Sequence, residues 1–122
     1  MPKDAFQYQA FDSTGTIVVD GWLIFKVNHS IPPDEEVNYL PISGEWHFSK
    51  IGNPVNIGNQ TGDGNLNGTI EEDQIWINLN PGIADDNVVL NGKINGRIIK
   101  GHWYYSIFVG AINGGSFKAV KQ

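Results

Sequence analysis

A five-residue unit, in which a glycine has an apolar residue two positions before it and another two positions after it, recurs along the chain. Side chains alternate across the pleat of a β-strand, so the glycine and both apolar residues share one face. Glycine weakens a strand unless the backbone bends sharply or another segment comes close, as happens in a narrow barrel. We therefore expect these glycines to line the inside of a small barrel. The units are Val19-Asp-Gly-Trp-Leu23, Ile42-Ser-Gly-Glu-Trp46, Leu66-Asn-Gly-Thr-Ile70, Leu90-Asn-Gly-Lys-Ile94 and Ile99-Lys-Gly-His-Trp103.

Turn signals separate the alternating apolar runs. Asn95-Gly96 favours a two-residue hairpin, Asn80-Pro81-Gly82 ends the strand around Trp76, and Asn113-Gly114-Gly115 is interpreted as the turn before the last strand. We predict an all-β fold for residues 1–122 as a single domain, with about eight strands in an antiparallel up-and-down meander closed into a barrel. The predicted strands are residues 6–11, 16–29, 39–50, 64–71, 74–80, 87–95, 97–109 and 115–121, and the long loops 31–36 and 52–62 are candidate lids.

Charge and composition exclude several functions. The formal net charge is −5 and the sequence has no cluster of lysine or arginine, so neither nucleic acid nor an anionic membrane is an expected partner. The absence of cysteine excludes disulfides and thiolate chemistry. No apolar stretch has the length of a signal peptide core or a membrane span, so we expect a cytoplasmic protein. No catalytic or cofactor-binding motif is present, so an enzyme is not expected and no cofactor is predicted.

Several of these segments resemble a known family. Ile42-Ser-Gly-Glu-Trp46, followed by Gly64-Asn-Leu-Asn-Gly-Thr-Ile70, is similar to the first hairpin of avidin-like proteins, in which a G-x-W strand precedes an L-x-G-x-aromatic strand. Ile99–Trp103, Ser106–Gly110 and Phe117–Val120 look like later strands of that family, and lipocalins and other calycins share the G-x-W strand.

The resemblance implies a calycin-like barrel that binds a small molecule. Avidin-like pockets hold biotin with an Asn two residues after the first-strand Trp and with a Tyr and a Ser on the second strand. This chain has Phe48, Ile70 and Glu72 at those positions, so the resemblance implies a more apolar interior than a biotin site has.

Large aromatic residues that the register directs inward are the candidate binding residues. They predict a non-enzymatic barrel that holds a small apolar or aromatic ligand. The same pattern also fits a filled barrel, with a structural role or oligomerisation through an aromatic outer face, and an isomerase or cyclase that works by cavity shape. A carbohydrate-binding module is a further alternative, with Trp22, Trp76 and Tyr104 as exposed aromatics. The candidate ligand-binding residues are Phe25, Trp46, Phe48, Trp103 and Tyr105.

Two patterns suggest metal binding. The segment from Asp63 to Ile70 fits the start of a calcium loop, but Gln74 stands where a bidentate Glu is needed, and a turn that feeds a strand explains the same residues. His47 and His102 each precede or follow an inward tryptophan, so both point outward and can lie near one another. They lack a third ligand. We therefore predict no metal site.

Overall fold

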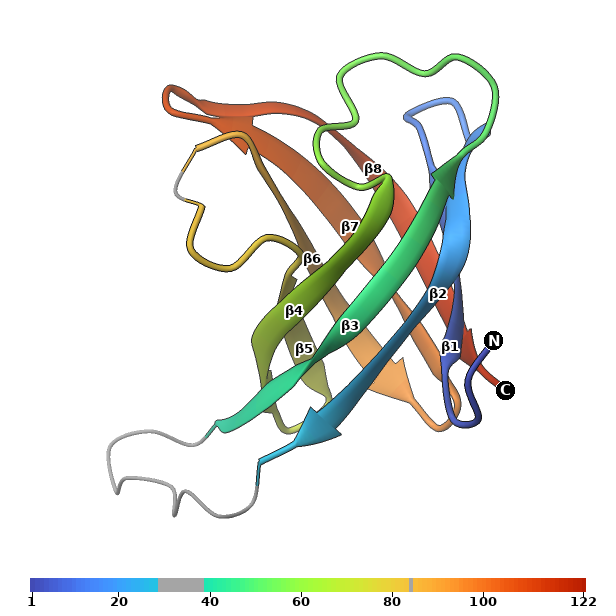
Figure 1. Cartoon of the computed structure of the whole chain (residues 1–122), viewed down its shortest axis with the longest axis vertical. Helices are drawn as coiled ribbons and strands as arrows, with labels where there is room; N and C mark the ends of the chain where they lie inside the picture. The colour runs from blue at the N-terminus through green and yellow to red at the C-terminus, as the bar shows by residue number, and fades with distance from the viewer. Residues whose placement is uncertain (29–38, 84) are drawn as a thin grey trace.

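The computed structural model describes residues 1–28, 39–83 and 85–122. These residues form eight strands and no helix. The strands make a closed antiparallel barrel in which each strand pairs with the next along the chain and the last pairs with the first (Figure 1). The predicted meander barrel is confirmed, and it is compatible with a calycin-like fold. The strands are β1 (Phe6–Phe11), β2 (Ile17–Val27), β3 (Leu40–Lys50), β4 (Gly62–Glu71), β5 (Gln74–Asn78), β6 (Asn87–Asn95), β7 (Ile98–Ile107) and β8 (Gly110–Lys121).

The two ends of the barrel carry different connections. The β1–β2, β3–β4, β5–β6 and β7–β8 connections lie at the upper end in Figure 1, and both chain termini lie at the lower end with the short β4–β5 and β6–β7 turns. Of the two predicted long loops, 52–62 is at the upper end, whereas 31–36 lies outside the described residues. Within the described ranges, no helix could cross a membrane.

The repeated glycines lie where neighbouring strands approach most closely. Gly44 pairs with Phe25 on one side and Leu66 on the other, so it shares the inner face with them. A Cβ atom at Gly44 would collide with the carbonyl oxygen of Ile24. A Cβ atom would also collide with a backbone carbonyl of an adjacent strand at Gly21, Gly68, Gly92 and Gly101. The expectation that these glycines line a tightly curved wall is confirmed.

The start of the last strand differs from its prediction. β8 begins at Gly110, and the turn before it contains Phe108 and Val109, so the interpretation of Asn113-Gly114-Gly115 as a turn was wrong. Gly115 lies within β8, and glycine fits there because a Cβ atom would collide with the carbonyl oxygen of Phe11 and lie 2.8 Å from Nε1 of Trp103. The other strand ends differ from their predicted positions by fewer residues. β2 ends at Val27, β4 begins at Gly62, β5 ends at Asn78 and β7 spans Ile98–Ile107.

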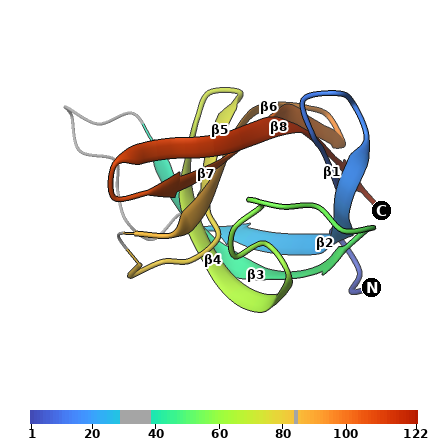
Figure 2. The same ribbon diagram turned by 90° about the horizontal axis from the view of Figure 1, so that it is seen from above.

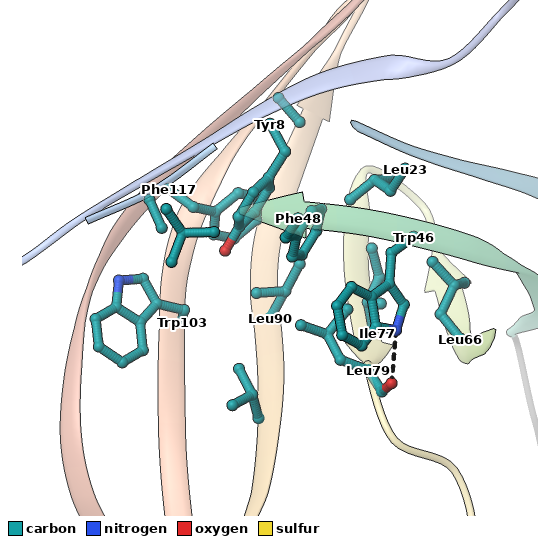
Figure 3. Packing of buried hydrophobic residues seen from close by; sticks show 14 of the residues in the cluster. Tyr8, Leu23, Trp46, Phe48, Leu66, Ile77, Leu79, Leu90, Trp103 and Phe117 are labelled. Atoms are coloured by element: carbon teal, nitrogen blue, oxygen red, sulfur yellow. Dashed lines mark hydrogen bonds between the residues drawn. The ribbon is translucent and has the colours of Figure 1, made fainter. Parts of the chain in front are cut away.

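Buried side chains from all eight strands fill the middle of the barrel (Figure 3). Two tryptophans anchor this core, and both satisfy their indole N–H groups on backbone carbonyls, as buried polar groups require. Trp46 Nε1 donates to the oxygen of Leu79 at 2.7 Å, and Trp103 Nε1 donates to the oxygen of Phe11 at 2.9 Å. Each of these tryptophans pairs with a glycine on the next strand, Trp46 with Gly64 and Trp103 with Gly115. The glycines make room for the indole rings.

We predict that Gly44→Ala destabilises the barrel by about 3 kcal/mol or more, because the new methyl group has no space beside the β2 backbone. Gly52→Ala is the matched control. Gly52 has a φ of 71° and open space around it, so alanine there costs only about 1 kcal/mol of backbone strain. Urea unfolding followed by tryptophan fluorescence measures both, and equal losses for the two variants would contradict the close approach at Gly44.

Candidate functional site

Three of the predicted binding residues belong to the packed core. Trp46, Phe48 and Trp103 are almost completely buried and belong to one continuous hydrophobic cluster. Tyr8 stacks on Phe48 with ring centroids 4.1 Å apart, and on Phe117 with centroids 5.7 Å apart. In the described part of the chain, the middle of the barrel is thus occupied by these side chains (Figure 3).

The upper end of the barrel is covered by the loop between β3 and β4. Seen from above, this loop runs across the opening (Figure 2). It buries Ile57 and the whole Gln60 side chain. Gln60 Nε2 donates to the oxygen of Ile57 at 2.8 Å, and the Tyr8 hydroxyl donates to Gln60 Oε1 at 3.4 Å. The buried amide therefore has partners on both of its ends. Sequence reasoning missed Gln60 because an irregular loop has no periodicity that marks inward residues.

Asparagine side chains fasten this loop to the neighbouring connections. Asn113 of β8 donates to the oxygen of Asn56 at 3.1 Å, and Asn80 donates to the oxygen of Asn59 at 3.2 Å. Asn59 in turn donates to the oxygen of Asp86 at 3.1 Å. The abundant asparagines thus tie the β3–β4 loop over the core as well as supplying turns.

Tyr105, another predicted binding residue, lies at this closed end. It packs against the core cluster, and its ring lies so close to Gly58 of the loop that a Cβ atom there would come within 2.5 Å of the ring. Its hydroxyl donates a hydrogen bond to Asp86 Oδ1. That bond raises the pKa of Tyr105, because it stabilises the protonated phenol beside a carboxylate. Tyr105 therefore helps to hold the cover of the upper end.

Phe25 is the predicted residue that lines a pocket, and this pocket lies at the lower end of the barrel. β2 continues past the start of β1 there, so its residues after Leu23 have no strand partner on β1. The pocket has a volume of about 510 Å³, within the usual range for small-ligand sites. We call it the lower-mouth pocket. Its lining residues are Asp4, Phe6, Ile24, Phe25, Lys26, Val27, Ile94, Gly96 and Lys121.

The lower-mouth pocket combines an aromatic wall with charged groups at its rim. Phe6 and Phe25 stack with ring centroids 5.4 Å apart and an interplanar angle of 6°. Lys121 Nζ lies 5.9 Å from the centroid of the Phe6 ring, which is within the range of a cation–π contact. Lys26 and Asp4 are exposed at the same rim. The arrangement suits an apolar or aromatic body with a polar end.

The outward aromatic residues do not form one platform. Trp22 stacks on His47 with ring centroids 4.2 Å apart, and His47 Nδ1 lies 2.5 Å from Asp63 Oδ1, so these three residues form a row across β2, β3 and β4. Trp76 and Tyr104, which are 39% and 40% exposed, lie on β5 and β7 instead.

The structure does not bring the two histidines together. His47 is on β3 and His102 is on β7, four strands away around an eight-stranded barrel. The calcium interpretation also meets a geometric obstacle, because Asp63 belongs to the extended strand β4. Alternate residues of a strand lie about 6.6 Å apart along it, so their oxygens do not converge on one ion. Among the described residues, no group of three or more acidic or histidine side chains lies close enough to hold a metal.

Comparison of the chain with protein-family models, curated proteins and solved structures gives no match. The barrel is therefore established by its own geometry, and the resemblance to avidin-like proteins stays a prediction.

We predict that Tyr8 forms a phenolate only when the barrel unfolds. Burial raises the pKa of Tyr8 well above its ordinary value, because the charged form has no solvation in the core. The resulting stabilisation is complete below the unfolded-state pKa of about 10 and is lost as the pH rises above it. Alkaline titration by phenolate absorbance, run beside circular dichroism, should show one tyrosine that titrates with unfolding. Tyr8→Phe should remove that step, and a Tyr8 signal before unfolding would contradict the assignment.

Proposed function

We propose that this protein is a non-enzymatic binding barrel that takes a small apolar or aromatic ligand in the lower-mouth pocket. The observation that carries the proposal is the partly buried Phe25 ring, stacked on Phe6 at the wall of a 510 Å³ pocket. Strand number and meander topology are compatible with it, since closed barrels of eight strands are either filled by side chains or hold one small ligand, and barrel mouths are common ligand sites.

The unequal ends of the barrel support this location. At the upper end, Gln60 and Ile57 occupy the interior and asparagine bonds hold the loop that carries them. At the lower end, Phe25, Val27 and Ile94 are only partly buried although they pack against the core. A ligand that covered these three side chains would gain about 25 cal/mol for each Å² of apolar surface removed from water. The ligand would therefore cover apolar side chains that the described residues leave partly exposed at the lower end.

The rim of the pocket indicates the kind of ligand. Among the described residues, Lys26 and Lys121 bring two positive charges to the mouth, against one carboxylate from Asp4. An apolar molecule with a neutral or weakly anionic polar end fits this balance, because its polar end stays in water beside the lysines while its body meets Phe6 and Phe25.

We predict that Phe25→Ala weakens the binding of Nile red, an uncharged apolar dye, by about tenfold or more, because the variant removes the main aromatic wall of the pocket. Val55→Ala is the control, since Val55 is an exposed apolar residue in the β3–β4 loop at the opposite end. Fluorescence titration of the folded proteins measures the dissociation constants. Equal affinities of the wild type and Phe25→Ala would exclude the lower mouth as the site.

The β7–β8 turn supports a second candidate function, in which copies of the chain associate. Phe108 and Val109 are 89% and 84% exposed at its tip, and Ile112 is exposed beside them. Exposed apolar clusters of this kind are typical of interaction sites.

We expect light scattering to show self-association of the wild type as its concentration rises, whereas the double variant Phe108→Ser, Val109→Ser stays a monomer. The physical reason is the loss of two apolar side chains that water does not solvate well. A wild-type protein that stays monomeric up to millimolar concentration would remove this second candidate and leave the ligand-binding proposal untouched.

A further inference from the structure

Three lysines from three different strands meet on the outer face of the barrel. Lys93 of β6 pairs directly with Lys100 of β7, and Lys100 pairs directly with Lys118 of β8. All three side chains are exposed. Adjacent strands lie about 4.8 Å apart, so the row of three spans about 10 Å. We call it the lysine row. It holds three of the eight basic residues of an acidic chain, a grouping that the sequence hides because the lysines are far apart in it.

The lysine row has an energetic cost. Like charges directly opposite one another on neighbouring strands repel, and each such pair destabilises the sheet. Across the described ranges, the one ion pair is between His47 and Asp63, on the far side of the barrel, so no carboxylate pairs with these lysines. Asp73, the acidic residue that lines a depression together with Lys93 and Lys100, makes no ion pair with either. Such a row gains stability when an anion from outside the chain lies on it.

Polar and aromatic side chains lie beside the lysine row on the same face. The next row across the sheet contains Trp76 on β5, Asn91 on β6, His102 on β7 and Ser116 on β8, each paired with the next. Tyr104 follows His102 on the same face of β7 and is 40% exposed. Exposed aromatic faces stack on sugar rings, and amide, imidazole and hydroxyl groups hydrogen-bond to sugar hydroxyls.

The surface is hollowed on both sides of Lys93 and Lys100. A depression of about 320 Å³ contains Gln74, Asn91, His102 and Tyr104 along with both lysines, and the adjacent glycines Gly92 and Gly101 also line it. A second depression of about 590 Å³, towards the β6–β7 turn, is lined by the same two lysines. The lysine pair therefore stands between two hollows, where it can contact successive units of a chain-like ligand.

We infer that this outer face binds an acidic saccharide, meaning an oligosaccharide that carries a carboxylate or a sulfate on its sugar rings. The lysine row contacts the anionic groups, while Tyr104, Asn91 and His102 contact the rings and hydroxyls. The lower-mouth pocket lies at the barrel end and is lined by other lysines, although it shares Ile94 with the 590 Å³ depression.

A saccharide fits this face better than a membrane or a nucleic acid duplex does. Both of those partners present an extended negative surface, and the net charge of −5 repels such a surface at long range. A short acidic saccharide meets the three lysines at close range, and its rings make use of the hollows and of Tyr104.

The test is isothermal titration calorimetry of the full chain with oligogalacturonate, with a sulfated oligosaccharide and with an uncharged malto-oligosaccharide of the same length. The first two probes separate carboxylate from sulfate as the anionic group, and binding of either one supports the inference.

Lys100→Gln should weaken that binding by about tenfold, because it removes the central charge-assisted contact. Lys50→Gln is the matched control, since Lys50 is an exposed lysine on β3 and the change in net charge is the same. Its affinity should equal that of the wild type.

Three results would overturn the inference: no binding of either acidic saccharide, equal binding of the uncharged one, or the same affinity for Lys100→Gln and Lys50→Gln. Phosphatidylserine vesicles and duplex DNA are included at matched charge concentration. Stronger binding to either of them, with loss in Lys100→Gln, also overturns the saccharide assignment. Nile red binding is measured on the same Lys100→Gln sample and should be unchanged, so failure at this face is distinguishable from failure of the lower-mouth pocket.

Discussion

The close approach of neighbouring strands at the inward glycines determines the shape of the whole barrel. At Gly21, Gly44, Gly68, Gly92 and Gly101 the adjacent backbone lies where a side chain would otherwise be. A sheet of eight strands closes on itself only if its strands bend and coil strongly, and residues without a Cβ atom permit that bend. Most of the remaining inner positions hold large side chains, and together with the glycines they fill the narrow interior.

The two ends of the barrel differ because their connections differ. The β3–β4 loop is long enough to fold back over the upper end, and its backbone carbonyls receive amide donors from Asn113 and Asn80. The β4–β5 and β6–β7 connections at the lower end are tight turns, which extend the strands without covering the interior. In the described part of the chain, most of the partly buried apolar side chains that pack against the core lie at the lower end, where Phe25 and Ile94 line a pocket.

Alternation and glycine spacing were sufficient to predict the fold from the sequence. They placed Trp46 and Trp103 in the core and the repeated glycines on the inner wall, because a side-chain period of two depends only on local geometry. They failed at Asn113-Gly114-Gly115, which was predicted to be a turn. Gly115 instead leaves room for the hydrogen bond between Trp103 and Phe11. Composition alone does not distinguish these two uses of glycine.

The candidate site was predictable only in part. Phe25 was identified because it faces inward, but its position at a mouth depends on how far β2 extends past β1. Gln60 and the lysine row were missed for the same reason: each depends on residues brought together by tertiary structure. Lys93, Lys100 and Lys118 are neighbours only through the register of β6, β7 and β8.

The pairing of β1 with β8 has a consequence for how the chain reaches its native state. β1 contributes Tyr8 to the centre of the core, and Phe11 at its end accepts the Trp103 hydrogen bond, yet its second neighbour is the final strand. During synthesis the apolar face of β1 has β2 alone beside it until β8 has emerged. Contacts of such large sequence separation form slowly, so the nascent protein spends its most aggregation-prone interval as an open sheet with two free edges.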